Sequence, residues 1–301
     1  LWNLNGRLSV AAKYFEQDMD SDDASFSNRP DKLERNDTPT ASPSELSFDA
    51  LNLELAYRFD WATLLSSSNL IHKHNLVDPD ITRTVERYGG GFVFNVPVTQ
   101  ALLQSIALHQ STDITARGVT QELRLTSPDD GGPWEWLAGL WYLDWQQFVD
   151  QKIPTPILSQ QSGLLLLLPG ALRLLDPAVL SDTVDSVGSE KAVFGEVTRH
   201  LGEKWQLTLG GRYFQTQIDA TVATSGLSNP VLFSGLRTEN TFNIVSRGFN
   251  PKASLRYEAN HNLAFYALAS KGFQFGGVQL APNSPLNTGA PIEATYKSST
   301  L

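Results

Sequence analysis

The chain has 301 residues, a net charge of −9 and no cysteine, which excludes a disulfide framework, a thiolate metal site and a cysteine nucleophile. Its acidic balance argues against a nucleic-acid partner, and no apolar run, including the leucines Leu164–Leu168, approaches the roughly 20 residues of a membrane helix. Charged residues make up 18% of the chain against about 25% in ordinary soluble domains, while aromatic residues reach 10%. The chain is therefore poor in the charged residues that keep the surface of a soluble protein in solution.

Alternation of apolar and polar residues with a period of two predicts β-strands along the whole chain. The clearest case puts Leu51, Leu53 and Leu55 on one face and polar residues such as Asn52 on the other. Strands with regular alternation are expected at 4–14, 51–59, 205–213 and 249–258. Less regular strands are expected at 61–74, 118–127, 134–149, 190–201 and 262–275. The sequence therefore predicts an all-β fold with about nine strands.

The connections between these strands alternate strictly between short and long. Short links are expected around Asp60, at 128–133, at 202–203 and at 260–261, and long ones at 16–46, 75–117, 150–189 and 219–247. A soluble sandwich has no reason for this alternation, whereas an outer-membrane barrel has short turns on one side and long extracellular loops on the other. We therefore predict an antiparallel transmembrane β-barrel whose leucine face meets lipid, so that Leu53→Arg is costly and Asn52→Arg is mild.

Strand length and aromatic placement agree with this prediction. An apolar band about 25 Å tall needs about ten residues per tilted strand, which is the length of the regular strands. Aromatic residues flank all four short links and would form an interfacial girdle, although aromatic residues are common in strands of any kind. They are Tyr57, Phe59, Trp61, Trp134, Trp136, Trp205, Tyr257, Phe265 and Tyr266.

Six short segments also occur in a familiar order. They are TQELRLTS (120–127), WLAGLWY (136–142), AVFGEVT (192–198), LTLGGRY (207–213), NPKASL (250–255) and YALASKGFQFGG (266–277). The series resembles the barrel of TonB-dependent outer-membrane receptors, and residues 1–119 match that family only in general style.

The resemblance implies a 22-stranded barrel in the outer membrane of a Gram-negative bacterium, with a plug domain in its lumen. It implies energy-coupled uptake of a scarce nutrient such as a siderophore-bound iron, cobalamin or a carbohydrate. The partners would be membrane lipid, a small-molecule ligand such as an iron chelate, and a TonB-type energy coupler reached through the plug; no cofactor is implied. Because plug, coupling box and last strands are not in the sequence, we expect residues 1–301 to be part of one barrel domain.

The first long loop is the most acidic segment, with ten acidic and three basic residues in 16–49. Asp18, Asp20 and Asp22 begin like a calcium loop, but Asp23 stands where the turn needs glycine and Arg29 where the bidentate glutamate should be. A solvated acidic loop is the favoured interpretation, with loose binding of a hard divalent cation as the alternative.

Other candidate binding residues lie further along the chain. His72 and His74 share one face of a strand and could hold a metal or an iron chelate, but a polar pair facing the lumen is favoured. Arg83, Arg87 and Tyr88 could bind an anionic ligand by bidentate hydrogen bonds and stacking, or be ordinary loop residues.

The remaining features leave alternatives open. Residues 164–175 could form an exposed apolar patch or a short helix over the barrel mouth. No motif of a nucleophile elbow, zinc helix or nucleotide site is present, so we predict a protein that is not an enzyme. A passive porin-like channel is the first alternative, and a soluble secreted β-rich carbohydrate-active protein is the second.

Overall fold

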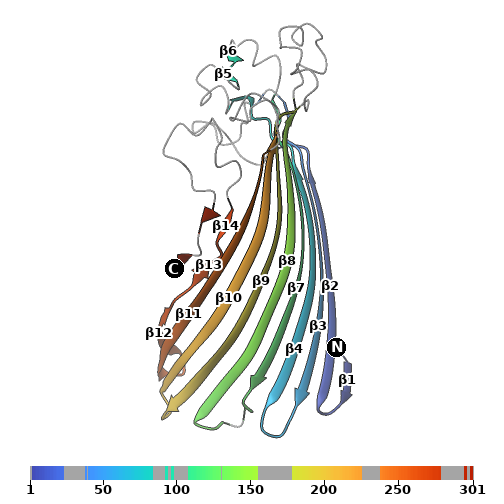
Figure 1. Ribbon diagram of the computed structural model, residues 1–301. Coiled ribbons are helices and arrows are strands. Elements are labelled where there is room, and N and C mark those ends of the chain that lie inside the picture. Colours follow the sequence, from blue (N-terminus) through green and yellow to red (C-terminus); the bar gives the residue numbers. More distant parts are fainter. Residues whose placement is uncertain are drawn as a thin grey trace.

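The computed structural model describes residues 2–23, 38, 40–83, 92–93, 96–97, 108–129, 131–154, 178–225, 238–278, 295–296 and 299–300. Most of them form one large antiparallel sheet (Figure 1). Its strands are β1 (Trp2–Asn5), β2 (Leu8–Ser21), β3 (Ser44–Arg58), β4 (Thr63–Val77), β7 (Ser111–Thr126), β8 (Trp134–Pro154), β9 (Ala178–Leu201), β10 (Trp205–Ser225), β11 (Thr238–Asn260) and β12 (Leu263–Ser270). Two-residue strands complete the set: β5 (Phe92–Val93), β6 (Val96–Pro97), β13 (Phe273–Gln274), β14 (Gly277–Val278), β15 (Thr295–Tyr296) and β16 (Ser299–Thr300). These six strands pair in three two-stranded sheets, β5-β6, β13-β16 and β14-β15.

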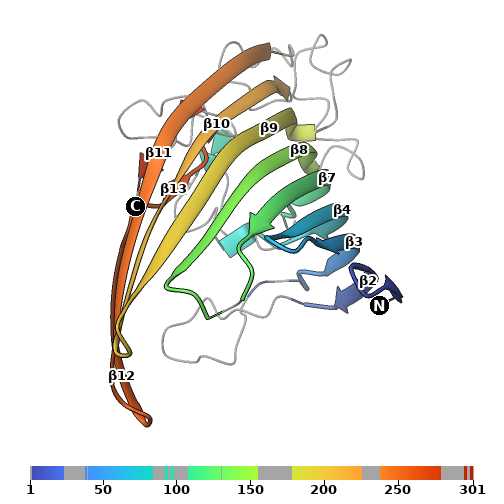
Figure 2. The same ribbon diagram turned by 90° about the horizontal axis from the view of Figure 1, so that it is seen from below.

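Each strand of the large sheet pairs with the next one in space, in the order β1-β2-β3-β4-β7-β8-β9-β10-β11-β12. The pairing is continuous over long stretches; β9 and β10, for example, stay in register from Leu201↔Trp205 to Ser181↔Ser225. Viewed along its strands, the sheet curls into an open arc with β1 and β12 at its edges (Figure 2). The predicted all-β architecture of up-and-down strands is therefore confirmed as a sector of a barrel.

The convex face of the sheet is apolar. Leu51, Leu53 and Leu55 of β3 are 43%, 41% and 40% exposed, as side chains that meet lipid should be. Since directly paired residues lie on the same face of a sheet, the register extends this assignment from strand to strand. The leucine row of β3 continues through Leu70 of β4 and Val119 of β7, which are also exposed. The predicted lipid-facing side of β3 is confirmed.

Aromatic rings gather at the ends of the strands that carry the short turns. The ring of Phe59 lies 4.6 Å from that of Tyr57 and 5.9 Å from that of Trp61, measured between centroids. Trp61 in turn stacks 6.4 Å from Trp136 of β8, although the two residues lie 75 positions apart in the chain. These aromatic residues form a belt at one end of the sheet, which is where an interfacial girdle lies.

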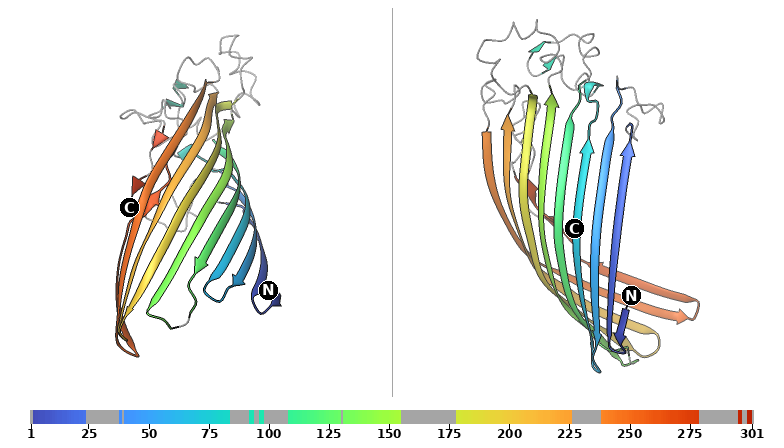
Figure 3. Two further views of the ribbon diagram at one scale, coloured as in Figure 1. Left: turned by 60° about the horizontal axis from the view of Figure 1, so that its bottom comes forward. Right: turned by 90° about the vertical axis from the view of Figure 1, so that its right-hand side faces the viewer.

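The short turns lie where the alternation of apolar and polar residues predicted them. At the other end, however, the strands extend further beyond the apolar band than predicted. Gly202 adopts a φ of 68° in the tight turn between β9 and β10, a conformation that favours glycine. At the opposite end, β8 and β10 have 21 residues, β9 has 24 and β11 has 23. All four expected loops, at 16–46, 75–117, 150–189 and 219–247, therefore begin or end inside strands, because hairpin pairing continues beyond the apolar band. Figure 3 shows the long strands lying side by side over their whole length.

The C-terminal part of the predicted strand 262–275 leaves the sheet. β12 ends at Ser270, and the chain then turns onto the concave face, where β13 lies inside the arc (Figure 2). Phe273 stacks on Phe214 of β10 with centroids 3.9 Å apart, and Val278 packs against the buried valines of β8–β10. Contact with this apolar inner surface competes with continued pairing along β11. Among the residues placed in the structure, no helix is long and apolar enough to cross a membrane.

Candidate functional site

The concave face of β7–β11 is the candidate site, because it carries charged side chains at the level of the apolar band, where the convex face presents residues such as Val193, Tyr213 and Phe249. Register puts the inward residues of neighbouring strands into rows. One row contains Glu190 of β9 and Thr216 of β10, and the next contains Trp141 of β8 and Phe214 of β10. A hollow of about 330 Å³ extends from these rows toward the short turns and is lined by Glu122, Arg124, Leu137, Trp141, Glu190, Phe194, Glu196 and Arg212.

An ion pair between Arg212 and Glu190 is the centre of this hollow. The Glu190 side chain is only 5% exposed, and an Arg212 Nη2–H donates to its Oε1. The Arg212 guanidinium also lies 5.7 Å from the ring centroid of Trp141. A buried carboxylate needs such a partner, and the planar guanidinium supplies both a hydrogen bond and a cation–π contact. The pair fixes a polar, oriented surface on the inner wall.

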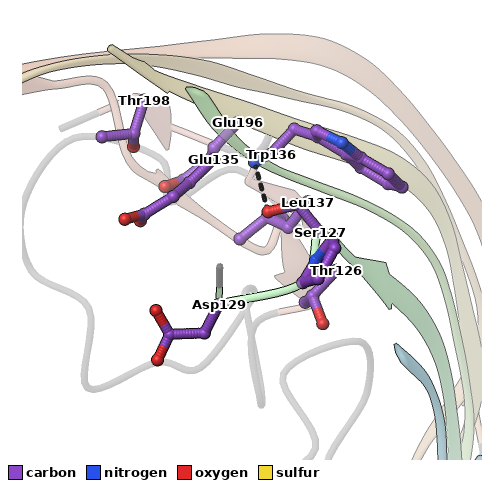
Figure 4. Close-up of a pocket in the computed structure, with 9 residues that line it drawn as sticks. Thr126, Ser127, Asp129, Glu135, Trp136, Leu137, Glu196 and Thr198 are labelled. Atoms are coloured by element: carbon purple, nitrogen blue, oxygen red, sulfur yellow. Dashed lines mark hydrogen bonds between the residues drawn. The ribbon is translucent and has the colours of Figure 1, made fainter. Parts of the chain in front are cut away.

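A second set of charges lies nearer the short turns. Lys252 Nζ of β11 donates to Glu196 Oε1 of β9 at 2.7 Å, across the intervening strand β10. Glu196 also borders a hollow of about 340 Å³, together with Thr126, Ser127, Pro128, Asp129, Glu135, Trp136, Leu137 and Thr198. Figure 4 shows Asp129 and Glu135 reaching toward this hollow, while the indole of Trp136 lies on the other side of the strand. The lower inner wall is therefore acidic, with one carboxylate already neutralised by lysine.

The upper inner wall is apolar and then polar again. Val149, Val184 and Val222 are buried in one row across β8, β9 and β10. One row higher, Asp182 is fully buried and pairs in register with Gln151 and Thr224. Asp182 lies 19 residues above Leu201, well beyond the roughly ten residues that cross the band. Burial raises the pKa of Asp182, and a contact with Thr224 opposes this shift only in part.

A buried polar cluster ties together the bases of the first two long connections. The Asp80 carboxylate accepts hydrogen bonds from Thr40 N and Oγ1, at 2.9 and 2.6 Å, and from Thr82 N at 2.9 Å. Thr40 Oγ1 is also 2.8 Å from His109 Nε2, and the Ser42 hydroxyl accepts from Asp80 N at 3.0 Å. Burial acts to raise the pKa of Asp80, but the hydrogen bonds from Thr40 and Thr82 outweigh it and hold this pKa below its ordinary value.

The two predicted histidines share a face, as expected, but the prediction that it is the lumen face is wrong. His72 pairs in register with Asp49, two residues from the outward Leu51, so both histidines lie on the convex side. His72 Nδ1 is 3.8 Å from Asp49 Oδ2, and His74 Nε2 is 2.9 Å from Asp113 Oδ1. Each histidine therefore has its own acidic neighbour, and no common ligand position is formed between them.

The other predicted residues are only partly within the described chain. Asp18 and Asp20 lie on β2 rather than in a loop, and Asp22 follows that strand. The described residues contain no group of three or more candidate metal ligands. Arg83 is half-buried next to the Asp80 cluster, whereas Arg87, Tyr88 and the apolar segment 164–175 lie outside the described residues.

Sequence reasoning missed the inner-wall charges. Arg212 and Glu196 occupy inward positions of strands that the alternation identified, so charge at mid-strand on the polar face was the available signal. Their pairing with Glu190 and Lys252 was not visible, because it depends on register between strands.

The sequence matches the model of the TonB-dependent receptor-like β-barrel over residues 2–297. The chain belongs to the TonB-dependent receptor family. The receptor chain is similar in fold to the ferric yersiniabactin uptake receptor FyuA from Yersinia pestis, with a TM-score of 0.66 and 12% identity over 98% of this chain and 38% of that one. It is also similar to the siderophore receptor PiuA from Acinetobacter baumannii, with a TM-score of 0.54 and 13% identity over 95% of this chain and 41% of that one.

The receptor chain is much shorter than these two solved structures. It spans about two fifths of the length of the two solved structures. At this level of identity the likeness to them concerns the fold alone. No curated protein sequence matches the chain.

Proposed function

We propose that this chain forms one sector of the barrel of an outer-membrane receptor in a Gram-negative bacterium. The receptor takes up a small extracellular ligand by active transport and is not an enzyme. The carrying observation is the contrast between the two faces of the sheet: the convex face is apolar, whereas the concave face holds Arg212–Glu190 and Lys252–Glu196. A soluble sandwich would bury its apolar face, so this contrast speaks against the carbohydrate-active alternative.

An iron chelate is the ligand class that we favour, with cobalamin or a carbohydrate as alternatives. The two structural relatives are named as a ferric yersiniabactin uptake receptor and a siderophore receptor, which supports this choice. Ligand capture falls to the long connections, where we propose that Arg83, Arg87 and Tyr88 contact an anionic ligand. The plug and its TonB-type energy coupler would act through parts of the protein outside residues 1–301.

Uptake of radioactive iron tests this proposal and separates it from a passive channel. Cells that express the full-length protein in a strain without its gene are offered a panel of ferric siderophores, with and without a protonophore. Active transport predicts uptake of at least one chelate that the protonophore abolishes. Uptake of small solutes that persists with the protonophore would support the porin-like alternative. If no chelate is taken up, the same cells are offered cobalamin and oligosaccharides, and energy-dependent uptake of one of these would correct the ligand class.

A further inference from the structure

One row of polar residues crosses the convex face of β8–β11. Tyr142 pairs with Lys191, Lys191 with Gln215, and Gln215 with Arg247, so the four side chains lie on the same face of four neighbouring strands. Neighbouring strands are about 4.8 Å apart, which separates Lys191 from Arg247 by about 10 Å. Both cations are solvent-exposed in the structure.

The row lies at the edge of the lipid-facing surface. In the row immediately below it, Val193, Tyr213 and Phe249 are 51%, 51% and 56% exposed. Lys191 stands ten residues above Leu201, which corresponds to about 25 Å for a strand tilted by about 40° and is the height of the apolar band. The two cations are therefore at the level of lipid headgroups on the side of the long loops.

Neither cation has a hydrogen-bond or ion-pair partner among the residues that the structure describes. The inward Lys252 and Arg212, in contrast, are paired with carboxylates. The nearest acidic side chain on the same face is Asp144, one row higher. Its carboxylate accepts a hydrogen bond from the Tyr142 hydroxyl at 3.4 Å.

The charge at this level changes sign around the arc. On β2 and β3 the first polar residues above the apolar band are Glu16 and Asp49, which pair in register. On β7, Arg117 donates from both Nε and Nη2 to Gln146 Oε1, so its fork is occupied. A free cationic pair is thus confined to β9 and β11 among the strands described. A headgroup of negative charge is attracted to that sector and repelled from the opposite edge.

We infer that Lys191, Gln215 and Arg247 bind the phosphorylated headgroup of an anionic membrane lipid, whose acyl chains lie along Val193, Tyr213 and Phe249. Lysine and arginine donate to phosphate oxygens, and Gln215 adds a neutral donor between them. The inference rests on the proposed membrane location of the receptor. It assigns the lipid to one sector of the barrel rather than to its whole circumference.

Native mass spectrometry of the full-length protein in detergent micelles tests the site, with added lipid A, which carries two phosphates, and with phosphatidylcholine as the neutral comparison. Each basic residue at an anionic lipid surface contributes about a fivefold gain in binding, so Lys191→Gln/Arg247→Gln should weaken lipid A retention about 30-fold. The matched control is Lys73→Gln/Lys204→Gln, which removes the same charge from the concave face and from a short turn. The control should retain lipid A like the unmodified protein.

Insertion into phosphatidylcholine vesicles separates the two proposals. If the protein does not insert, the membrane barrel and the lipid site both fail. If it inserts but Lys191→Gln/Arg247→Gln retains lipid A as well as the control does, only the lipid site is overturned. Selective loss of lipid A from the Lys191→Gln/Arg247→Gln protein, with insertion intact, supports the site.

Discussion

Leu53→Arg is the most direct test of how the sheet meets the membrane. Leu53 lies on the convex face and pairs with Ala12 of β2 and Ser68 of β4, which lie on the same face. Replacement by arginine would place a cation among these lipid-facing side chains. We expect the folded barrel to lose stability in lipid while the secondary structure of any folded fraction stays unchanged.

The size of this effect follows from the depth of Leu53. It is five residues above Arg58, the last residue of β3, which places it about 13 Å along the membrane normal for a strand that rises 3.3 Å per residue and tilts by about 40°. This is the middle of a band about 25 Å tall, where arginine costs about 2–4 kcal/mol. The same substitution near either interface would cost about 0–1 kcal/mol.

A good control places arginine at the same depth in the membrane but on the opposite face of the sheet, and breaks no other interaction. Asn52→Arg is less suitable than the sequence suggested, because Asn52 Nδ2 donates to Ser67 Oγ at 3.1 Å and to Asn69 Oδ1 at 2.8 Å. Loss of each bond would cost about 1 kcal/mol whichever face the residue occupies. Ala11 and Ala12 of β2 form a matched pair, since Ala12 pairs with Leu53 and Ala11 with the inward Glu54.

Guanidinium titration of the full-length protein folded in phosphatidylcholine vesicles measures the three arginine variants. Leu53→Arg and Ala12→Arg should each lower the free energy of unfolding by about 2–4 kcal/mol. Ala11→Arg, next to a carboxylate in the lumen, should change it by less than about 1 kcal/mol. Equal losses for Ala11→Arg and Ala12→Arg would refute the assignment of faces.

Three further predictions concern the inner wall and the loop bases. Arg212→Met leaves the buried Glu190 without its cation and should cost about 3–5 kcal/mol, whereas Arg212→Met/Glu190→Leu should recover most of this in the same titration; no recovery would contradict a paired charge. The raised pKa of Asp182 means that its ionisation destabilises the fold as the pH rises above its ordinary value of about 3.9. Asp182→Asn should therefore raise the Tm at neutral pH and flatten this part of the pH profile, and an unchanged profile would show that Asp182 is not the titrating group. The lowered pKa of Asp80 has the opposite sign, so its stabilisation is complete above about pH 3.9 and is lost as the pH falls through the lowered pKa. Asp80→Asn should lower stability at pH 7 by about 1.5–3 kcal/mol, with the difference from the unmodified protein shrinking in acid, and a constant difference would contradict it.

The strands and their faces were predictable where lipid meets one side and water the other. At Leu51, Leu53 and Leu55 this difference imposes a strict period of two, and the structure confirms the facing. The short turns were predictable for a related reason, because the aromatic residues beside them mark the edge of the membrane. Both signals are local, so one sequence is enough to detect them.

Facing failed where a strand is polar on both sides. Residues 66–69 read Ser-Ser-Ser-Asn, so this part of β4 has no alternation of apolar and polar residues from which the faces of His72 and His74 could be assigned. Only the register with β3, fixed by Leu51↔Leu70, shows that these histidines point outward. A one-residue slip would have reversed the conclusion, which is why the alternation of a single strand could not decide it.

The upper inner wall was unpredictable for the same physical reason. β9 is 24 residues long, which is about 60 Å along the membrane normal, whereas the apolar band accounts for about 25 Å. Above the band both faces meet water, so selection for an alternating pattern ends although backbone pairing continues. Val184 and Asp182 therefore lie on paired strand in a segment whose sequence looked like loop. Substitutions there change the chemistry of the wall on a backbone that β8 and β10 hold in place, so their effects on ligand uptake and on folding should be separable.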